Sequence, residues 1–386
     1  MSTAAPPSAQ PSVRRSAHFQ RVRDFWQRVS EGRDIDDLWS QFVADARSSY
    51  GFYGKDVDWD EVHRLPAWKR PLRVGWQLFW AMMMKLAPAR RVLLLVSLVL
   101  LVVSGIQIRS EQFNTDIRFE SIAALLLLLL LSLELADKVV MKRDLEIARE
   151  IQGWLVPSEP PVVPGAEIAF CTRPQNSVAG DYYDAFYPGD DGAAGGKLMV
   201  IIADVAGKSV PAALLMATLQ SSLRTLASER MPLAQLAERL NRHVCRHSLN
   251  GQRFTTAFIA EYDPAIRRLE YINAGHNAPV LQRANGGTDR LQSGSLPLGI
   301  APDAAFSCTA VDLQRGDTLV LFTDGVVEAF NSAGEEFSDA RWLNAIRSLP
   351  NVPAQETLRR LMKKVEDFVG KTRQSDDITC LVLQIK

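Results

Sequence analysis

Two uncharged apolar blocks in the first half of the chain predict helices of membrane-spanning length. Val92 to Ile108 holds 17 residues without a charge, and Ser121 to Leu133 contains seven consecutive leucines. The second block reaches the roughly 20 residues of a spanning helix only if neighbours such as Glu120 and Glu134 are included. A pair of buried core helices is the competing interpretation, because that block is short. We expect a two-helix transmembrane hairpin over residues 91–136.

Basic side chains flank this hairpin on the side of both chain ends. They are Lys85, Arg90, Arg91, Lys138, Lys142 and Arg143. The connecting loop, RSEQFNTDIR, holds two arginines. Because Lys and Arg are enriched on the cytosolic side of membrane proteins, we expect a multi-pass protein of the inner (cytoplasmic) membrane with both ends in the cytosol.

The segments around the hairpin differ from it in composition. Residues 1–20 are small, polar and rich in proline, which predicts a disordered tail. Residues 21–90 form an aromatic-rich cytosolic region whose role the sequence does not reveal. Residues 137–157 predict a linker helix that stops at Pro157, with apolar residues seven positions apart. That short seam leaves two interpretations open, a homodimer through the linker helix and a helix that packs on the following domain.

From Ala166 to Lys386, apolar runs of strand length alternate with two helix-like segments. The strand-like runs are KLMVIIADVAG, FTTAFIAEYD, RLEYINAGHNAPVLQR, DTLVLFTDGVVEAF and DITCLVLQIK. VPAALLMATLQSSLRTLA and PLAQLAERLNRHVCRHSL have apolar positions at helical spacing. Short connections such as DPAIRR favour antiparallel pairing. We therefore expect an α+β domain, a β-sandwich flanked by helices rather than a doubly wound parallel sheet.

Charge and cysteine content narrow the classes of function. The chain holds 44 Lys and Arg residues and 44 Asp and Glu residues, so no global field attracts nucleic acid. No basic patch with interleaved aromatic residues predicts nucleic-acid binding either. The four cysteines form no C-x-x-C pair. This indicates reduced thiols in a cytosolic domain rather than a disulfide framework or a zinc site.

Acidic residues stand at or beside the ends of four apolar runs. They are Asp181 and Asp184 in VAGDYYD, Asp204 in IIADVAGK, Asp324 in LFTDGVVE, and Asp376 and Asp377 in SDDITCLVL. One Asp before a Gly is an ordinary turn. Four such positions would gather unpaired carboxylates at one end of a sheet, where repulsion raises their pKa values and costs stability. Bound cations remove that cost, and oxygen-only ligands favour Mg²⁺ or Mn²⁺ over zinc.

These motifs, in this order, resemble the SpoIIE-type branch of the PPM family of metal-dependent protein phosphatases. The resemblance covers residues 144–386 and also includes DLEIAREIQGWLVP, NAGHNAPVL and LPLGI. It implies a four-layer α-β-β-α sandwich phosphatase domain over residues 158–386. It also implies two Mg²⁺ or Mn²⁺ ions, and hydrolysis of phosphoserine or phosphothreonine by metal-activated water.

The resemblance also assigns roles to single residues. It implies that the catalytic residues are Asp181, Asp204 and Asp324. The implied metal ligands are Asp181, Asp204, the Val205 carbonyl, Asp324, Asp376 and Asp377. Asp204 is the expected bridge between the two ions, and Asp377 is an alternative to Asp376. For Asp184 we expect a capping role or a contact to a metal through water.

Two departures from the family pattern concern the site itself. The turn usually written D-x-x-G-K-G reads DVAGKS here, so a backbone requirement for Gly at Ser209 is open. A phosphate-clamping arginine like that of the eukaryotic members is not evident. Arg173 and Lys208 are the candidates, with ordinary surface charges as the alternative.

Three histidines stay outside the predicted catalytic set. We expect His276, in NAGHNAPVL, to lie in a tight turn and to bond backbone groups, with a general-acid or metal-ligand role as the alternative. His243 and His247 are four residues apart on a predicted helix. Because no third ligand is near them, we expect a solvated or partly packed face.

The sequence and the resemblance together predict a membrane-anchored protein-serine/threonine phosphatase whose hairpin regulates the domain through the linker helix. The resemblance implies a phosphorylated regulatory protein as substrate, such as an antagonist of an anti-sigma factor in a partner-switching pathway. One alternative is a membrane-anchored binding module that keeps the fold but has little turnover. Another is a Mg²⁺-dependent cyclase or nuclease, for which the sequence lacks a purine-selecting Lys or Arg pair.

Overall fold

The computed structural model describes residues 54, 57–66, 68–105, 119–189, 196–247, 253–292 and 294–386. The chain divides into two compact units, Met1–Asp137 and Lys138–Lys386. The predicted disordered tail and the loop predicted between the two membrane spans lie outside the described residues.

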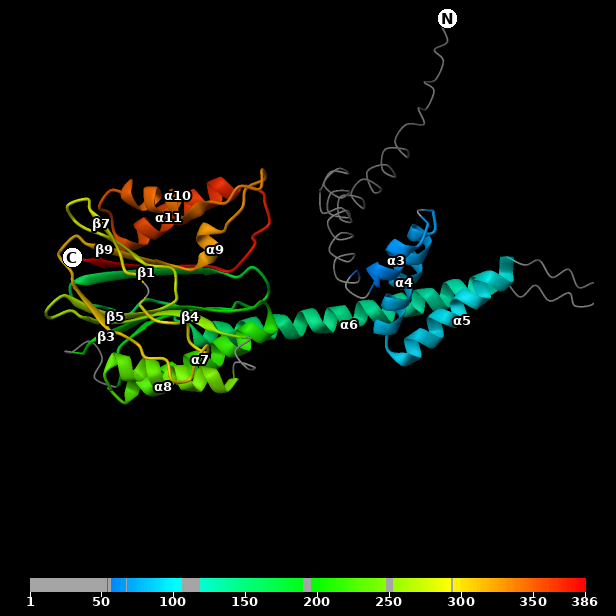
Figure 1. Cartoon of the computed structure of the whole chain (residues 1–386), viewed down its shortest axis with the longest axis horizontal. Helices are drawn as coiled ribbons and strands as arrows, with labels where there is room; N and C mark the ends of the chain where they lie inside the picture. Colours follow the sequence, from blue (N-terminus) through cyan, green and yellow to red (C-terminus); the bar gives the residue numbers. More distant parts are fainter. Residues whose placement is uncertain are drawn as a thin grey trace, which may run out of the picture. The chain divides into compact units, whose positions relative to one another are not determined.

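The described part of the first unit is helical. Helices α3 (Trp59–Arg64), α4 (Arg70–Lys85) and α5 (Pro88–Gly105) precede α6 (Phe119–Leu155). α5 and the first half of α6 lie side by side (Figure 1). Arg90 of α5 forms ion pairs with Glu134 and Asp137 of α6, at 2.8 and 2.7 Å.

Helix α6 joins the second apolar block to the predicted linker in one uninterrupted helix. It is the one helix in the described parts of the chain that is long and apolar enough to cross a membrane. Leu125, Leu128 and Leu131 each expose at least 60% of their surface. The helix ends at Leu155, because the residue before Pro157 disfavours helical backbone. By length and composition α6 is thus a candidate membrane span, and the two-helix hairpin stays a prediction.

The second unit is built on two five-stranded antiparallel sheets. Their strand orders are β1-β10-β9-β6-β7 and β2-β3-β4-β5-β8. The strands are β1 (Ala166–Arg173), β2 (Asp181–Phe186), β3 (Leu198–Val205), β4 (Thr255–Asp263), β5 (Arg268–Ala274), β6 (Val280–Gln282), β7 (Thr288–Arg290), β8 (Thr309–Asp312), β9 (Thr318–Phe322) and β10 (Ile378–Ile385). The antiparallel pairing expected from the short connections is confirmed.

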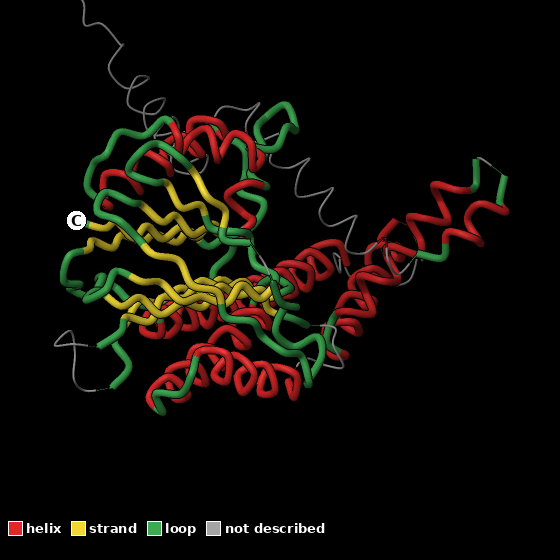
Figure 2. The backbone as a smooth tube through the Cα atoms, turned by 60° about the vertical axis from the view of Figure 1, so that its left-hand side comes forward, coloured by secondary structure: helices red, strands yellow, loops and turns green. Residues whose placement is uncertain are grey.

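Helices cover the outer face of each sheet, so that the unit has four layers (Figures 1 and 2). The helices are α7 (Val210–Ser228) and α8 (Leu233–His247) on one side, and α9 (Asp324–Val327), α10 (Ser338–Arg347) and α11 (Ala354–Val369) on the other. A buried apolar cluster fills each interface between layers. Representative members are Met216 under the first helices, Phe258 between the sheets and Trp342 under the second helices. The expected α-β-β-α sandwich is confirmed.

Two of the predicted strands end earlier than their apolar pattern suggests. RLEYINAGHNAPVLQR is not one strand, because β5 and β6 belong to different sheets. The chain crosses between the sheets at Gly275, which has a φ of +71°. A Cβ there would lie 2.5 Å from Pro297 Cγ, so the crossing requires glycine. In DTLVLFTDGVVEAF, the strand stops at Phe322 and Asp324 begins the short helix α9.

Candidate metal centre and active site

Asp181 and Asp204 face each other across the neighbouring strands β2 and β3. Asp181 is buried and accepts a 2.9 Å hydrogen bond from Thr323 Oγ1. Thr323 directly follows β9 in the other sheet, and its backbone N–H donates to Thr379 O at 3.0 Å. Asp181 therefore joins the two sheets, and the candidate site lies at one end of the sandwich between them.

The backbone brings Asp324 beside the second acidic segment. Gly325 packs so closely against the chain at Asp377 that a Cβ on Gly325 would lie 2.0 Å from the Asp377 carbonyl oxygen. Only glycine allows two backbone segments to approach in this way. Asp324 and Asp376 are consequently close enough that each contributes to the electrostatics of the site.

Burial and mutual repulsion raise the pKa values of these carboxyl groups. For Asp181, burial and then the charge of Asp204 hold the pKa well above its usual range. Burial, followed by Asp324 and Asp376, raises the pKa of Asp204 to about 7. The pKa of Asp324 is raised by burial and by Asp376. The burial and repulsion of these carboxylates thus destabilise the folded site, and bound cations would remove this effect.

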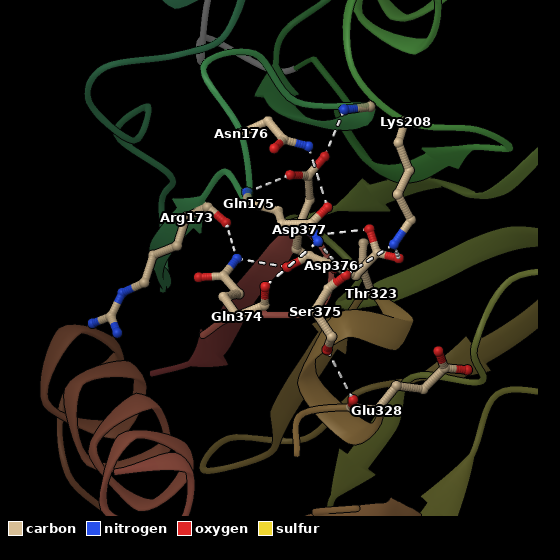
Figure 3. Close-up of polar contacts among 11 residues, drawn as sticks. Arg173, Gln175, Asn176, Lys208, Thr323, Glu328, Gln374, Ser375, Asp376 and Asp377 are labelled. Carbon is tan, nitrogen blue, oxygen red and sulfur yellow. Dashed lines mark hydrogen bonds and ion pairs between the residues drawn. The ribbon is translucent and has the colours of Figure 1, made fainter. Parts of the chain in front are cut away.

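Asp377 holds two loops together. Its carboxylate oxygens accept hydrogen bonds from the backbone N–H groups of Gln175 and Gly180, each at 2.7 Å. Gln175 Nε2 in turn donates to Ser375 O at 2.6 Å. These contacts tie the loop before Asp181 to the segment that carries Asp376 (Figure 3). This geometry favours Asp376 as a ligand and Asp377 as the residue that positions it.

Lys208 reaches into this cluster of carboxylates. Its ammonium lies 2.8 Å from Asp376 Oδ2 and donates to Ser375 O at 2.8 Å. Figure 3 shows the side chain extending toward Asp376. The positive charge of Lys208 partly offsets the increases in the pKa values of Asp204 and Asp324. Lys208 is therefore a counter-ion of the site and not a charge on an unrelated surface.

Arg173, the other candidate for a phosphate clamp, is engaged elsewhere. It forms an ion pair with Glu366 of α11, and in Figure 3 its guanidinium points away from Asp376 and Asp377. This pairing favours the alternative given for Arg173, an ordinary charge outside the site, over a phosphate clamp.

Asp184 also lies away from the site, which corrects the expectation of a cap or a water-mediated contact to a metal. Because side chains alternate along β2, Asp184 shares a face with Tyr182 and not with Asp181. It is buried, accepts a 2.7 Å hydrogen bond from the Tyr182 hydroxyl, and receives two 2.9 Å hydrogen bonds from Arg224 of α7. The bidentate pair fastens α7 to the sheet.

His276 contacts the strand next to the one that carries Asp204. It is buried, its backbone N–H donates to Asn273 Oδ1 at 2.8 Å, and its Nδ1 lies 3.0 Å from Thr256 Oγ1. Thr256 is the partner of Asp204 across β3 and β4. Burial lowers the pKa of His276 to about 4, so the ring is neutral at pH 7. The expected tight turn is present, and the ring bonds a side chain of the neighbouring strand.

The backbone conformation of Ser209 shows whether the DVAGKS turn requires glycine at that position. Its φ of +66° and ψ of −150° lie in a region that is essentially restricted to glycine. The turn therefore keeps the backbone requirement of the family pattern, and Ser209 is strained. In the same turn, the Val205 carbonyl oxygen faces Gly180, where a Cβ would lie 3.3 Å away.

Two further residues at the site were not singled out by the sequence analysis. Thr323 orients Asp181, as described above. Burial and the charge of Asp324 raise the pKa of Glu328, and its backbone carbonyl accepts a 3.1 Å hydrogen bond from Ser375 Oγ. Both residues occur inside LFTDGVVE, within four residues of Asp324. Glu328 is four residues after Asp324, a spacing that places both on one face of a helix, and this pattern could have identified it.

The donor atoms of the candidate site suit metal ions by their chemistry rather than by their present spacing. In the parts of the chain that the structure describes, no three His, Cys, Asp or Glu side chains converge tightly enough to hold one ion. The chemistry nonetheless fits hard cations, because the donors are carboxylates and a backbone carbonyl. Ion binding therefore requires rotation of these carboxylate side chains.

Comparisons with known proteins agree with this arrangement. A sequence model of the family "Stage II sporulation protein E (SpoIIE)" matches residues 194–386. "Phosphoserine phosphatase RsbU" of Bacillus subtilis is 30% identical over 252 residues, which cover 64% of this chain and 71% of RsbU. "Protein IcfG" of Synechocystis sp. is 28% identical over 271 residues, which cover 63% of this chain but 42% of IcfG.

The fold has a counterpart among solved structures. The "SiaA-PP2C domain of Pseudomonas aeruginosa" superposes with a TM-score of 0.55 at 20% identity, covering 65% of this chain and 99% of that domain. At this identity the likeness concerns the fold alone. The match to the family model goes further, since it includes Asp204, Asp324 and Asp376, and RsbU is a relative at 30% identity. On these grounds, the chain belongs to the SpoIIE family.

Proposed function

We propose that this chain is a metal-dependent protein-serine/threonine phosphatase. The observation that carries the proposal is the convergence of Asp181, Asp204, Asp324 and Asp376, from both sheets, at one end of the sandwich. These carboxyl groups are buried or partly buried and have few cationic partners. Such an arrangement costs stability unless cations bind to it.

The proposed cofactors are two Mg²⁺ or Mn²⁺ ions. Asp181, Asp204, Asp324, Asp376 and the Val205 carbonyl would hold them. When bound, such ions polarise a phosphoryl group and acidify a water molecule.

Residues of the chain itself hold these ligands in place. Thr323 orients Asp181 through the 2.9 Å hydrogen bond. Asp377 holds the loop before Asp181 against the segment that carries Asp376, through its two backbone contacts. Lys208 neutralises Asp376 through the 2.8 Å ion pair. This division of roles needs no nucleophilic side chain.

The proposed substrate is a phosphoserine or phosphothreonine of a regulatory protein. Two of the relatives are named phosphoserine phosphatases, RsbU and RsbP of Bacillus subtilis. The chain covers 42% of IcfG and 59% of RsbP, so the activity, the partner-switching pathway and the anti-sigma factor antagonist are proposals for this chain.

We further propose that α6 anchors the protein in the inner membrane and regulates the site. The support is a direct contact within the second unit. The side-chain amide of Gln152 of α6 forms two hydrogen bonds with the backbone of Ala179. Its Nε2 donates to the Ala179 carbonyl at 2.7 Å, and its Oε1 accepts from the Ala179 N–H at 2.9 Å. Ala179 is two residues before Asp181, so a shift of the helix would move that ligand. A second span through α5 and a homodimer through the linker complete the proposal.

The test is phosphate release from a phosphoserine peptide by the full-length protein in detergent. We expect turnover with Mn²⁺, loss of turnover with EDTA, and loss in Asp324→Asn. Asp303→Asn is the matched control, because Asp303 is exposed and stands in no contact with the site. A folded, Mn²⁺-bound protein without turnover would favour the binding-module alternative, and cyclase activity on ATP or GTP would reject the phosphatase.

A further inference from the structure

A strip of basic side chains runs along α8 and ends beside the candidate site. We call it the basic strip, and its members are Arg239, Arg242, His243, Arg246, His247 and Arg253. The residues on α8 are spaced three and four apart, so they share one face of the helix. The opposite face of α8 carries Leu233, Leu236 and Leu240, which are buried on the sheet.

The basic strip lines a groove between α7 and α8. The groove has a volume of about 360 Å³ and is bordered on the α7 side by Ser221, Ser222 and Thr225. These neutral hydroxyl groups do not oppose the positive charge, and Thr225 Oγ1 donates to Ser221 O at 2.8 Å. His243 also borders a second, smaller hollow, together with His247 and Arg253. The basic strip is therefore continuous from the groove to Arg253.

Arg253 connects the basic strip to the metal-binding turn. The N–H of Ala206 donates to Phe254 O at 2.8 Å, which fixes residue 253 next to the turn that carries Asp204 and Val205. A Cβ on Gly207 would lie 2.9 Å from Arg253 Nη1. The guanidinium thus covers the glycine of this turn.

Much of the positive charge of the basic strip is not neutralised internally. Arg239 forms a 2.5 Å ion pair with Glu229. In the described parts of the chain, Arg242, Arg246 and Arg253 make no ion pair with a carboxylate. The side chains of the candidate site are negatively charged on balance, because its carboxylates outnumber the ammonium group of Lys208. A phosphoprotein with acidic sequence is attracted by such a positive surface, which raises its local concentration beside the site.

We propose that the basic strip is the docking surface for the phosphoprotein substrate, and that it selects acidic sequence around the phosphorylated residue. This inference rests on the proposed phosphatase function. Charge complementarity favours an acidic partner over a second copy of the chain. In a two-fold symmetric contact the arginines of one copy would face those of the other, which is unfavourable.

The test compares two phosphoserine peptides of about 15 residues, long enough in extended form to reach along α8. The acidic peptide carries Asp and Glu on both sides of the phosphoserine, and the neutral peptide carries Asn and Gln at the same positions. The full-length protein is assayed with Mn²⁺ in wild-type form and as Arg242→Glu with Arg246→Glu. The matched control is Arg315→Glu with Lys363→Glu, which makes the same charge change at two exposed positions away from α8.

The wild type should prefer the acidic peptide in kcat/KM by about tenfold, mainly through KM. The double variant should lose most of this preference, and the control should keep it. In 1 M NaCl the preference should shrink, because the Debye length falls to about 3 Å. Equal losses with both peptides, or an unchanged preference, would overturn the proposal. A change in oligomeric state by light scattering with the preference intact would assign the strip to self-association.

A binding assay keeps the two proposals separable. Anisotropy of the fluorescein-labelled acidic peptide, measured in EDTA, reports docking without turnover. If no protein hydrolyses either peptide, the phosphatase proposal fails. Tighter binding of the acidic peptide to the wild type than to the double variant would still support docking, and equal binding would reject it.

Discussion

The close approach between Gly325 and Asp377 gives a sharp prediction for Gly325→Ala. The added Cβ would stand 2.0 Å from the Asp377 carbonyl oxygen and 2.9 Å from the carbonyl carbon, where ordinary contacts begin at 3.4 Å. One backbone segment has to retreat by about 1.4 Å, since interiors are packed without spare volume. Overpacking of this kind typically costs about 1–3 kcal/mol of unfolding free energy.

The displacement also separates Asp324 from Asp376. A misplacement of about 1 Å in a catalytic constellation can cost about 100-fold in rate, so we expect activity to fall far more than stability. Chemical denaturation measures the stability, and peptide dephosphorylation with a Mn²⁺ titration measures the rate and the metal requirement. Gly294→Ala is the control, because nothing lies within 4 Å of a Cβ there. Wild-type stability and wild-type kcat in Gly325→Ala would refute this description of the site.

Three further predictions concern strain, pairing and pH. Ser209→Gly should raise the free energy of unfolding by about 1–3 kcal/mol in denaturant titrations, because it relieves the backbone strain at φ +66°. An unchanged free energy of unfolding would show that the turn is unstrained. Arg224→Met should lower the free energy of unfolding by about 2–3 kcal/mol, because buried Asp184 loses its ion pair while Arg224 itself is 43% exposed. Adding Asp184→Asn should restore part of this stability, and additive losses in the double variant would contradict the explanation. The His276 pKa is lowered to about 4, so its stabilising contribution is full above pH 6.5 and is lost as the pH falls toward 4, by up to about 3 kcal/mol. His276→Asn should remove this dependence, and an equally steep acid loss in the variant would argue against it.

The sequence predicted the second unit best where the hydrophobic pattern and the turn chemistry agree. Strands β3, β4 and β10 and helices α7 and α8 match their predicted segments closely, because each is a long buried run or a clear helical face. β1, α10 and α11 were not predicted individually. β1 mixes exposed and buried positions without regular alternation, so a period of two is not visible.

The end of β5 was missed for a different reason. Residues 268–283 look like one apolar run, and the crossing between sheets depends on Gly275 and on its contact with Pro297. That contact joins segments distant in the chain, so the local pattern contains no sign of it.

The candidate site was predictable to the level of residue types and not of contacts. The four acidic motifs were visible, and the structure brings Asp181, Asp204, Asp324 and Asp376 together. The separate roles of Asp184 and Asp377 depend on partners more than 30 residues away, Arg224 and Gly180. Strand alternation could have separated Asp184 from Asp181, but it could not have supplied the ion pair.

The central claim is that these carboxylates form a metal centre, and locating Mn²⁺ by anomalous diffraction from crystals of the protein tests it most directly. Two Mn²⁺ peaks are expected between Asp204, Asp324 and Asp376. Their absence from that end of the sandwich, in crystals whose protein dephosphorylates a peptide with Mn²⁺, would contradict it.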